Sequence, residues 1–278
     1  MAALSARTVS AWDGLALHIR DWGAASAAPA LLCLPGLVRT GEDFAGLAAR
    51  YGGGRRVVSL DYAGRGASGR AASVERYAPE ACMRDVLDVC SALHLHHAIV
   101  IGTSMGGVLA MALGAARPGM LKGVVLNDIG PELGDAGLAA VREHVGDDRA
   151  LPSLEHAAAH LRARLPDLSL STEAEWQRFA ALTYVQGPDS RFHPRWDTRI
   201  ASLLGREVPA LWPLFATLAG VPLLLVHGGR STILTAATVG RMRAARPDMG
   251  YAAVPESGHA PTLDEPAAVA ALDRFLAA

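Results

Sequence analysis

Short apolar runs alternate with Ala-rich amphipathic stretches along most of this 278-residue chain. Short runs of apolar and β-branched residues, bounded by Gly, Pro or polar residues, are typical of strands that are buried on both faces of a parallel sheet. The longer amphipathic stretches are typical of the helices that connect such strands. The pattern therefore predicts repeated strand-helix units around a mainly parallel sheet, which is an α/β fold.

The individual elements can be placed from this pattern, with boundaries uncertain by a few residues. The predicted strands are Leu15 to Asp21, Ala30 to Leu34, Val57 to Asp61, Ala98 to Ile101, Gly123 to Asn127, Pro222 to His227 and Gly250 to Val254. The predicted helices are Gly41 to Arg50, Pro79 to Leu93, Gly107 to Arg117, Ala236 to Ala245 and Pro266 to Ala277.

The alternation breaks between about Glu132 and Ala219, where we find no β-rich run and expect several amphipathic helices. Thr172 and Glu175 have the spacing of a capping box, which predicts that one helix begins there. We therefore predict a core made of residues 1–131 and 220–278, with residues 132–219 inserted as a helical cap.

Composition limits the classes of ligand and the location. The 26 Lys and Arg nearly balance the 27 Asp and Glu, and no basic stripe with interleaved aromatics is found, so nucleic acid is not an expected partner. The start of the chain lacks a signal-peptide pattern, and apolar runs such as Val221 to Val226 are too short to span a bilayer. We expect a cytoplasmic protein with a small-molecule ligand and no membrane partner. A homodimer is compatible with the sequence, which does not specify the oligomeric state.

Cysteines and histidines give no sign of a metal site or a disulfide framework. Cys33, Cys82 and Cys90 are few, odd in number and without metal-type spacing, so buried free thiols are expected. His94, His96 and His97 lie at a helix-to-strand connection with no Cys or carboxylate at ligand spacing, so we interpret them as a solvated loop. No metal and no cofactor is predicted.

A candidate nucleophile lies between a predicted strand and a predicted helix. The motif Gly102-x-Ser104-x-Gly106 follows the apolar strand directly and opens the amphipathic helix. A strained turn at this place exposes the serine hydroxyl, and only glycine at the flanking positions lets the neighbouring backbone approach closely. The positive end of the following helix favours negative charge at the site. In a chain with 29 glycines the motif alone would be weak, and a Gly-rich turn is the alternative.

With this motif the chain resembles the α/β-hydrolase superfamily, in particular its small bacterial cap-bearing serine hydrolases such as esterases and lactonases. The resemblance runs from about Trp12 to the C-terminus, and the cap matches only loosely. It implies a mainly parallel eight-stranded sheet with helices on both faces and an inserted helical cap. Four further segments carry it: Leu32 to Leu37, Asp61 to Ser68 (Asp-x-x-Gly-x-Gly-x-Ser), Gly123 to Pro131, and Ser257 to Pro261.

The resemblance also implies an oxyanion hole and a general base. The backbone N–H groups of Met105 and Leu37 would bind the oxygen that becomes negative, although Pro35 replaces the histidine that relatives have before Gly36. The alternative is that Pro35-Gly36 is only a loop turn. His259 comes late in the chain, after the last predicted strand, and would move the proton of Ser104.

The triad acid is missing from its expected position. Relatives read like Gly-x-x-Ser-Asp-Ile-Leu after the penultimate strand, whereas this chain has Thr232 in place of the Asp. Threonine cannot supply the negative charge that stabilises an imidazolium, and loss of the acid in a reference triad lowers the rate by about 10⁴. Asp128, at the end of the neighbouring strand, can serve as the triad acid. Alternatively, it has a structural role as a capping residue where the chain enters the helical cap. The other two interpretations are a weakened or engineered variant in which the usual Asp was changed, and a protein that binds a ligand or carries out non-hydrolytic chemistry. Glu256 and Asp264 lie too close to His259 in sequence to be the first choice.

Two other signals were weighed. Gly64-x-Gly66-x-x-Gly69 spells a dinucleotide fingerprint, but no helix opens directly after it, so a nucleotide site is not predicted. Aromatic residues of the cap can line an acyl pocket, although packing is the commoner role for aromatics at helical spacing; they are Trp176, Phe179, Tyr184, Trp196, Trp212 and Phe215.

The sequence thus predicts a cofactor-free serine hydrolase that cleaves a small, apolar carboxylic ester or lactone through an acyl-enzyme. Two alternatives stay open: a C–C bond hydrolase of the meta-cleavage type, and a ligand-binding pseudo-hydrolase, which Thr232 suggests. Epoxide hydrolases and haloalkane dehalogenases are disfavoured, because their nucleophile at this turn is Asp and this chain has Ser104.

Overall fold

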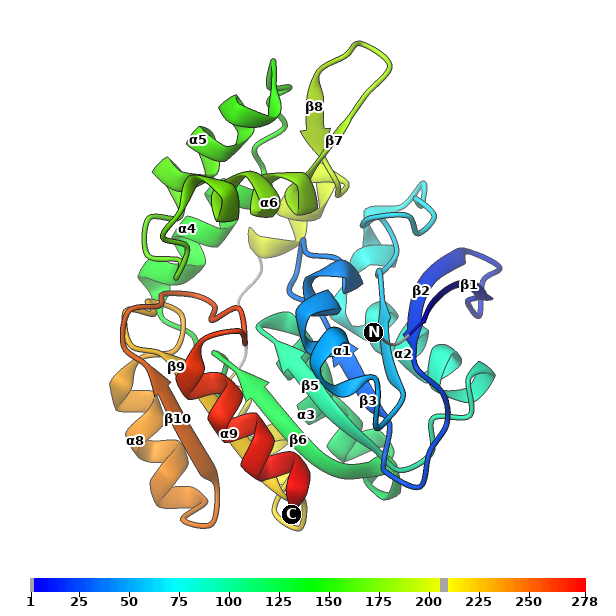
Figure 1. The fold of residues 1–278 in the computed structure, drawn as a ribbon, viewed down its shortest axis with the longest axis vertical. Coiled ribbons are helices and arrows are strands. Elements are labelled where there is room, and N and C mark those ends of the chain that lie inside the picture. The colour runs from blue at the N-terminus through cyan, green and yellow to red at the C-terminus, as the bar shows by residue number, and fades with distance from the viewer. Residues whose placement is uncertain (1–2, 206–209) are drawn as a thin grey trace.

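The computed structural model describes residues 3–205 and 210–278. Within them, one eight-stranded sheet has the order β1-β2-β4-β3-β5-β6-β9-β10 (Figure 1). Only the pairings of β2 with β1 and with β4 are antiparallel, so the prediction of a mainly parallel sheet is confirmed. The strands are β1 (Leu4–Ser10), β2 (Ala16–Trp22), β3 (Leu31–Leu34), β4 (Val57–Leu60), β5 (Ala98–Thr103), β6 (Leu121–Asn127), β9 (Leu223–Gly228) and β10 (Gly250–Val254).

Helices cover both faces of the sheet because successive strand residues are apolar on both sides. On one face Leu31 and Cys33 of β3 pack in a cluster with α1 (Ala45–Tyr51) and α9 (Pro266–Ala277). On the other face Leu32 and Leu34 pack in a cluster with α2 (Pro79–Ala92), α3 (Met105–Ala116) and α8 (Ala236–Ala245). The prediction of helices on both faces is therefore confirmed.

Some of the predicted elements need correction. Strand β1 was not predicted, because its sequence LSARTVS is largely polar and six of its seven residues are exposed. The segment predicted as one helix from Gly41 to Arg50 is a 3₁₀ turn, Gly41–Phe44, followed by α1. The expectation of no strand between residues 132 and 219 was wrong, since β7 (Tyr184–Gln186) and β8 (Phe192–Pro194) form a hairpin too short to show a strand pattern.

The segment between β6 and β9 lies over the carboxyl ends of the central strands (Figure 1). Besides the hairpin it holds α4 (Asp135–Val145), α5 (Leu154–Arg164), α6 (Glu173–Thr183), a 3₁₀ helix at Thr198–Gly205, and α7 (Trp212–Ala216). The predicted capping box of Thr172 and Glu175 is present at the start of α6. The division of the chain at residues 132 and 219 stays a prediction, and residues 206–209 within it lie outside the described residues.

Core and cap meet around the loop that follows β4. Gly66 N–H donates to the carbonyl of Arg195, and Asp197 N–H donates to the carbonyl of Gly64. Arg65 of this loop is completely buried.

No helix among the described residues combines the length and the apolar composition that crossing a bilayer requires.

Close packing of the backbone at the turn between β5 and α3 explains why residues 102 and 106 are glycine. A Cβ atom at Gly106 would overlap the carbonyl oxygen of Leu34, and one at Gly102 would overlap the carbonyl oxygen of Gly106. The neighbours in both cases are backbone atoms, which cannot rotate away. The turn between these glycines can therefore form only if both positions lack a side chain.

We predict that Gly106→Ala lowers the free energy of unfolding by about 2–3 kcal/mol, because the added methyl group must displace the backbone of β3. The measurement is equilibrium unfolding in urea. Gly119→Ala is the control, since no atom lies within 4 Å of a Cβ there, and it should change the same quantity by less than about 0.5 kcal/mol. Equal stability of the two variants would contradict the close approach of β3 and α3.

Candidate active site

Three predicted site residues lie in loops after strands of the central sheet, of which β5 and β6 are neighbours while β9 separates β6 from β10. Ser104 lies between β5 and α3, Asp128 directly follows β6, and His259 lies in the loop after β10. The carboxyl ends of parallel strands meet at one edge of a sheet, and ligands bind there in open α/β folds. Ser104 and Asp128 both have backbone φ values in the left-handed region, 52° and 53°, which is uncommon for residues with a side chain and marks both turns as tightly constrained.

A continuous chain of hydrogen bonds joins these three side chains. His259 Nε2 lies 2.8 Å from Ser104 Oγ, and His259 Nδ1 lies 2.8 Å from Asp128 Oδ2. An ionised carboxylate can only accept a hydrogen bond, so Nδ1 carries a proton and its N–H donates a hydrogen bond to Asp128. In the neutral ring Nε2 is then free to accept the Ser104 hydroxyl. This is the tautomer that a general base for Ser104 requires.

The backbone of β9 holds the Asp128 carboxylate in place. Its second oxygen, Oδ1, accepts the N–H of Gly228 at 2.8 Å, and Asp128 N–H donates to the carbonyl of Val226. The side chain is completely buried. A buried carboxylate is tolerated only when its oxygens accept hydrogen bonds, and here both do.

Two residues that the sequence analysis missed hold the loop of His259. Asn127 Nδ2 donates to the carbonyl of Pro261 at 2.9 Å, and Glu265 accepts the N–H groups of Thr262 and Leu263 at 2.8 and 3.0 Å. Glu265 also accepts the hydroxyl of Ser169 from the cap. The sequence signal for Asn127 is a polar residue at the end of an apolar strand, next to Asp128.

The two predicted oxyanion donors lie near Ser104. Met105 N–H opens α3, and a Cβ atom at Gly36 would lie 3.9 Å from Ser104 Cβ, so the turn before Leu37 reaches the nucleophile. In the described part of the chain neither the Met105 nor the Leu37 N–H group donates to a protein acceptor. The buried Arg65 donates from Nε to the Leu37 carbonyl at 2.9 Å and holds this loop. Both N–H groups are thus available to a ligand oxygen.

Thr232 lies away from the hydrogen-bond chain. The hydrogen bond of His259 Nδ1 goes to Asp128, and we find none between His259 and Thr232 among the described residues. Thr232 instead lines the cavity above Ser104. A Cβ atom at Gly134 or Gly137 would overlap the backbone of Thr232, so this loop packs tightly against the start of α4.

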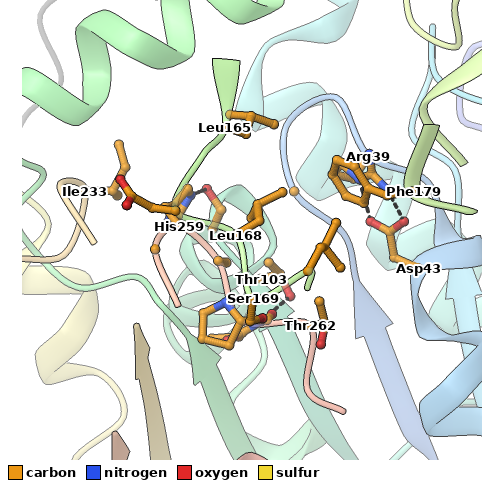
Figure 2. Close-up of a pocket in the computed structure, with 18 of the residues that line it drawn as sticks. Arg39, Asp43, Thr103, Leu165, Leu168, Ser169, Phe179, Ile233, His259 and Thr262 are labelled. Carbon is orange, nitrogen blue, oxygen red and sulfur yellow. Dashed lines mark hydrogen bonds and ion pairs between the residues drawn. The ribbon is translucent and has the colours of Figure 1, made fainter. Parts of the chain in front are cut away.

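A cavity of about 590 Å³ opens between the core and the cap and is lined by Ser104 and His259; its size is typical of a small-molecule site. Figure 2 shows His259 among the residues that line it. Its apolar wall includes Leu37, Leu165, Leu168 and Ile233. Among the cap aromatics only Phe179 lines it, whereas Trp176, Tyr184, Trp196 and Phe215 are buried in packing and Trp212 packs against the core. The charged lining residues include Arg39, Asp43 and Arg164.

The other singled-out residues lie elsewhere. His94, His96 and His97 form the connection between α2 and β5, and within the described residues no group of three or more His, Cys, Asp or Glu could hold a metal ion. Cys33, Cys82 and Cys90 are buried free thiols, and burial raises the pKa of Cys90 to about 12. Gly64, Gly66 and Gly69 belong to the loop that meets the cap.

The chain is similar to known hydrolases in sequence and in fold. The 3-hydroxybutyrate-oligomer hydrolase of Cupriavidus necator is 30% identical over 266 residues, which cover 92% of this chain and 90% of that protein. The 2-(acetamidomethylene)succinate hydrolase of Mesorhizobium japonicum is 24% identical over 247 residues, covering 88% and 85% of the two chains. The crystal structure of an alpha/beta hydrolase from Novosphingobium aromaticivorans has a TM-score of 0.94 and 37% identity, and the match covers 100% of this chain and 99% of that one.

The family model described as "Alpha/beta hydrolase family" matches residues 31–272, which is most of the chain. The predicted fold class, with its mainly parallel eight-stranded sheet, is thereby confirmed. The chain belongs to the alpha/beta hydrolase family and is an enzyme of the hydrolase type.

Proposed function

We propose that this protein is a serine hydrolase of carboxylic esters, with Ser104 as nucleophile, His259 as general base and Asp128 as the triad acid. One observation carries the proposal: the unbroken hydrogen-bond chain from Ser104 Oγ through the His259 ring to the buried Asp128 carboxylate. It combines a nucleophile, a base within reach of its proton and a group that orients the base, which together define an activated serine.

In the acylation step, Ser104 Oγ attacks the ester carbonyl carbon while His259 Nε2 takes the hydroxyl proton. The carbonyl oxygen becomes negative and accepts hydrogen bonds from the N–H groups of Met105 and Leu37. The tetrahedral intermediate then collapses, the bond to the alcohol oxygen breaks, and His259 gives its proton to the departing alcohol. The acyl group remains on Ser104.

Deacylation repeats these steps with water. Water attacks the acyl carbon, His259 Nε2 takes a proton from it, and the oxyanion again forms between Met105 and Leu37. Breaking the bond to Ser104 Oγ releases the carboxylic acid, and His259 returns the proton to Ser104. No step requires a metal or an organic cofactor.

The role of Asp128 argues against the binding-only alternative that Thr232 had suggested. While His259 holds the extra proton, the buried carboxylate at 2.8 Å stabilises the imidazolium, which a threonine hydroxyl cannot do. The N–H group of Gly228 donates to the Asp128 carboxylate and keeps it oriented. The acid would thus be supplied from β6 instead of from the loop after β9.

For the substrate we propose an ester that joins short hydroxy-acid units, because the 30% identical relative is named as a hydrolase of 3-hydroxybutyrate oligomers. Such oligomers carry a hydroxyl at one end, ester bonds between units and a carboxylate at the other end. A cavity of about 590 Å³ with an apolar wall is of the size that takes a small ligand of this kind. A lactone contains the same bond in cyclic form and would react through the same steps.

We predict that a fluorophosphonate adds once to the folded protein and that Ser104→Ala abolishes the addition, because only an activated serine reacts quickly with this reagent. The measurement is intact-protein mass after brief exposure. Ser231→Ala, which changes a serine of the loop after β9, is the control and should label like the wild type. A folded wild-type protein that stays unlabelled would overturn the proposal.

We predict that Asp128→Asn lowers kcat on p-nitrophenyl butyrate by about 10³- to 10⁴-fold, because the amide cannot stabilise the imidazolium. Thr232→Asp alone should bring no gain, since His259 Nδ1 is already occupied by Asp128. Steady-state kinetics check both, with thermal unfolding to show that Asp128→Asn is folded. If Asp128→Asn kept near-normal kcat, or if Thr232→Asp raised it markedly, Asp128 would not be the working acid.

A further inference from the structure

Arg39 lies in the loop after β3, where this loop meets α6 of the cap, and its guanidinium is held on three sides. Nε and Nη2 donate to the two carboxylate oxygens of Asp43, at 2.7 and 2.5 Å, and Nη1 donates to Thr183 Oγ1 at 2.5 Å. The guanidinium carbon lies 4.3 Å from the centre of the Phe179 ring (Figure 2). A charged group restrained in this way is preorganised to bind another group without losing further side-chain entropy.

The stem of Arg39 begins beside the nucleophile. A Cβ atom at Gly36 would lie 3.3 Å from Arg39 Cγ and 3.9 Å from Ser104 Cβ, so the two side chains border the same point. Arg39 lies two residues after Leu37, whose N–H is the proposed oxyanion donor. Both Arg39 and Ser104 line the cavity. Arg39 and Ser104 therefore face one cavity, which a single ligand can occupy.

Two N–H groups of the Arg39 guanidinium are not used by Asp43 or Thr183. Arginine carries five N–H donors, and Asp43 and Thr183 occupy three of them, which leaves one on Nη1 and one on Nη2. Two N–H groups on neighbouring nitrogens match the two oxygens of a carboxylate. Only 15% of the Arg39 side chain is exposed, so a hydrogen bond formed there is largely shielded from bulk water.

Two residues of the cap, His144 and Arg164, line this end of the cavity together with Arg39. His144 lines the cavity and has a pKa lowered to about 4, mainly by burial and then by the charges of Arg39 and Arg164, with Asp147 opposing. His144 is therefore neutral at pH 7. Arg164 also lines the cavity and forms ion pairs with the exposed Glu143 at 3.1 Å and with the buried Asp147 at 3.8 Å. The Arg39 end thus holds two guanidinium groups.

We propose that Arg39 binds a free carboxylate of the substrate and thereby selects esters whose alcohol part is itself an acid. This inference rests on the proposed ester hydrolysis and names its substrate class more closely. In a linear dimer of a 3-hydroxy acid, the carboxylate lies a few bonds beyond the scissile ester oxygen. With the ester carbonyl between Met105 and Leu37, that carboxylate would accept the spare N–H groups of Arg39.

A purely structural role of Arg39 makes a different prediction. Its bonds to Thr183 and its stacking on Phe179 join the core loop to α6, so Arg39 could serve only to hold the cap. Loss of these structural contacts would affect charged and uncharged substrates alike. Loss of a carboxylate partner would affect only substrates that carry a carboxylate.

The test compares kcat/KM on the linear dimer of 3-hydroxybutyrate with kcat/KM on its methyl ester, whose acid end is uncharged. For Arg39→Gln we expect the acid-to-ester ratio to fall about 10- to 100-fold, the loss expected for hydrogen bonds to a charged group. Arg39→Lys should recover part of the ratio. Thr183→Val, which removes the contact to α6 but keeps the charge, should leave the ratio within about threefold of the wild type.

Arg178→Gln is the control, because Arg178 is an exposed arginine that lines the same cavity from α6, the helix that carries Phe179 and Thr183. An equal fall of the ratio in Arg178→Gln would mean general attraction of anions and would overturn a specific contact to Arg39. An unchanged ratio in Arg39→Gln would overturn the proposed carboxylate contact and would favour a purely structural role of Arg39 in holding the cap. If the wild type left both dimers and p-nitrophenyl butyrate intact, the proposed function itself would fail.

Discussion

The hydrogen bond between His259 Nδ1 and the buried Asp128 carboxylate is the interaction on which the rest of the site depends. It fixes the tautomer and the direction of the imidazole, and through them the position of Nε2 at 2.8 Å from Ser104 Oγ. The fold supports this bond from two sides. Gly228 N–H holds the other carboxylate oxygen, and Asn127 holds the loop of His259 through the carbonyl of Pro261.

Adjacent parallel strands explain how the acid can come from β6. Strands β6 and β9 are hydrogen-bonded neighbours, with Asn127 opposite Val226, so the residues that follow them reach the same point above the sheet. A carboxylate after β6 can meet the histidine ring as well as one after β9. Thr232, after β9, forms part of the cavity wall next to α4.

Much of this arrangement was predictable from the sequence because its signals are local. Gly102-x-Ser104-x-Gly106 marks a turn that backbone packing requires, and the helices α8 and α9 match their predicted bounds because Thr235 caps one and Pro266 opens the other. The choice between Asp128 and Thr232 was not predictable, since it depends on which residue lies within reach of His259 across three strands. The edge strand β1 and the short hairpin of the cap were not predicted, because neither shows an alternation of apolar and polar residues. Arg39 was missed because a single arginine in a loop has no pattern.

Proton NMR tests the central claim, that Asp128 is the hydrogen-bond partner of His259, most directly. An imidazole N–H held by a carboxylate gives a strongly downfield proton resonance. The account predicts that the wild type shows this resonance, that Asp128→Asn loses it or shifts it far upfield, and that Thr232→Val leaves it in place. A resonance that survived Asp128→Asn but disappeared in Thr232→Val would contradict the account.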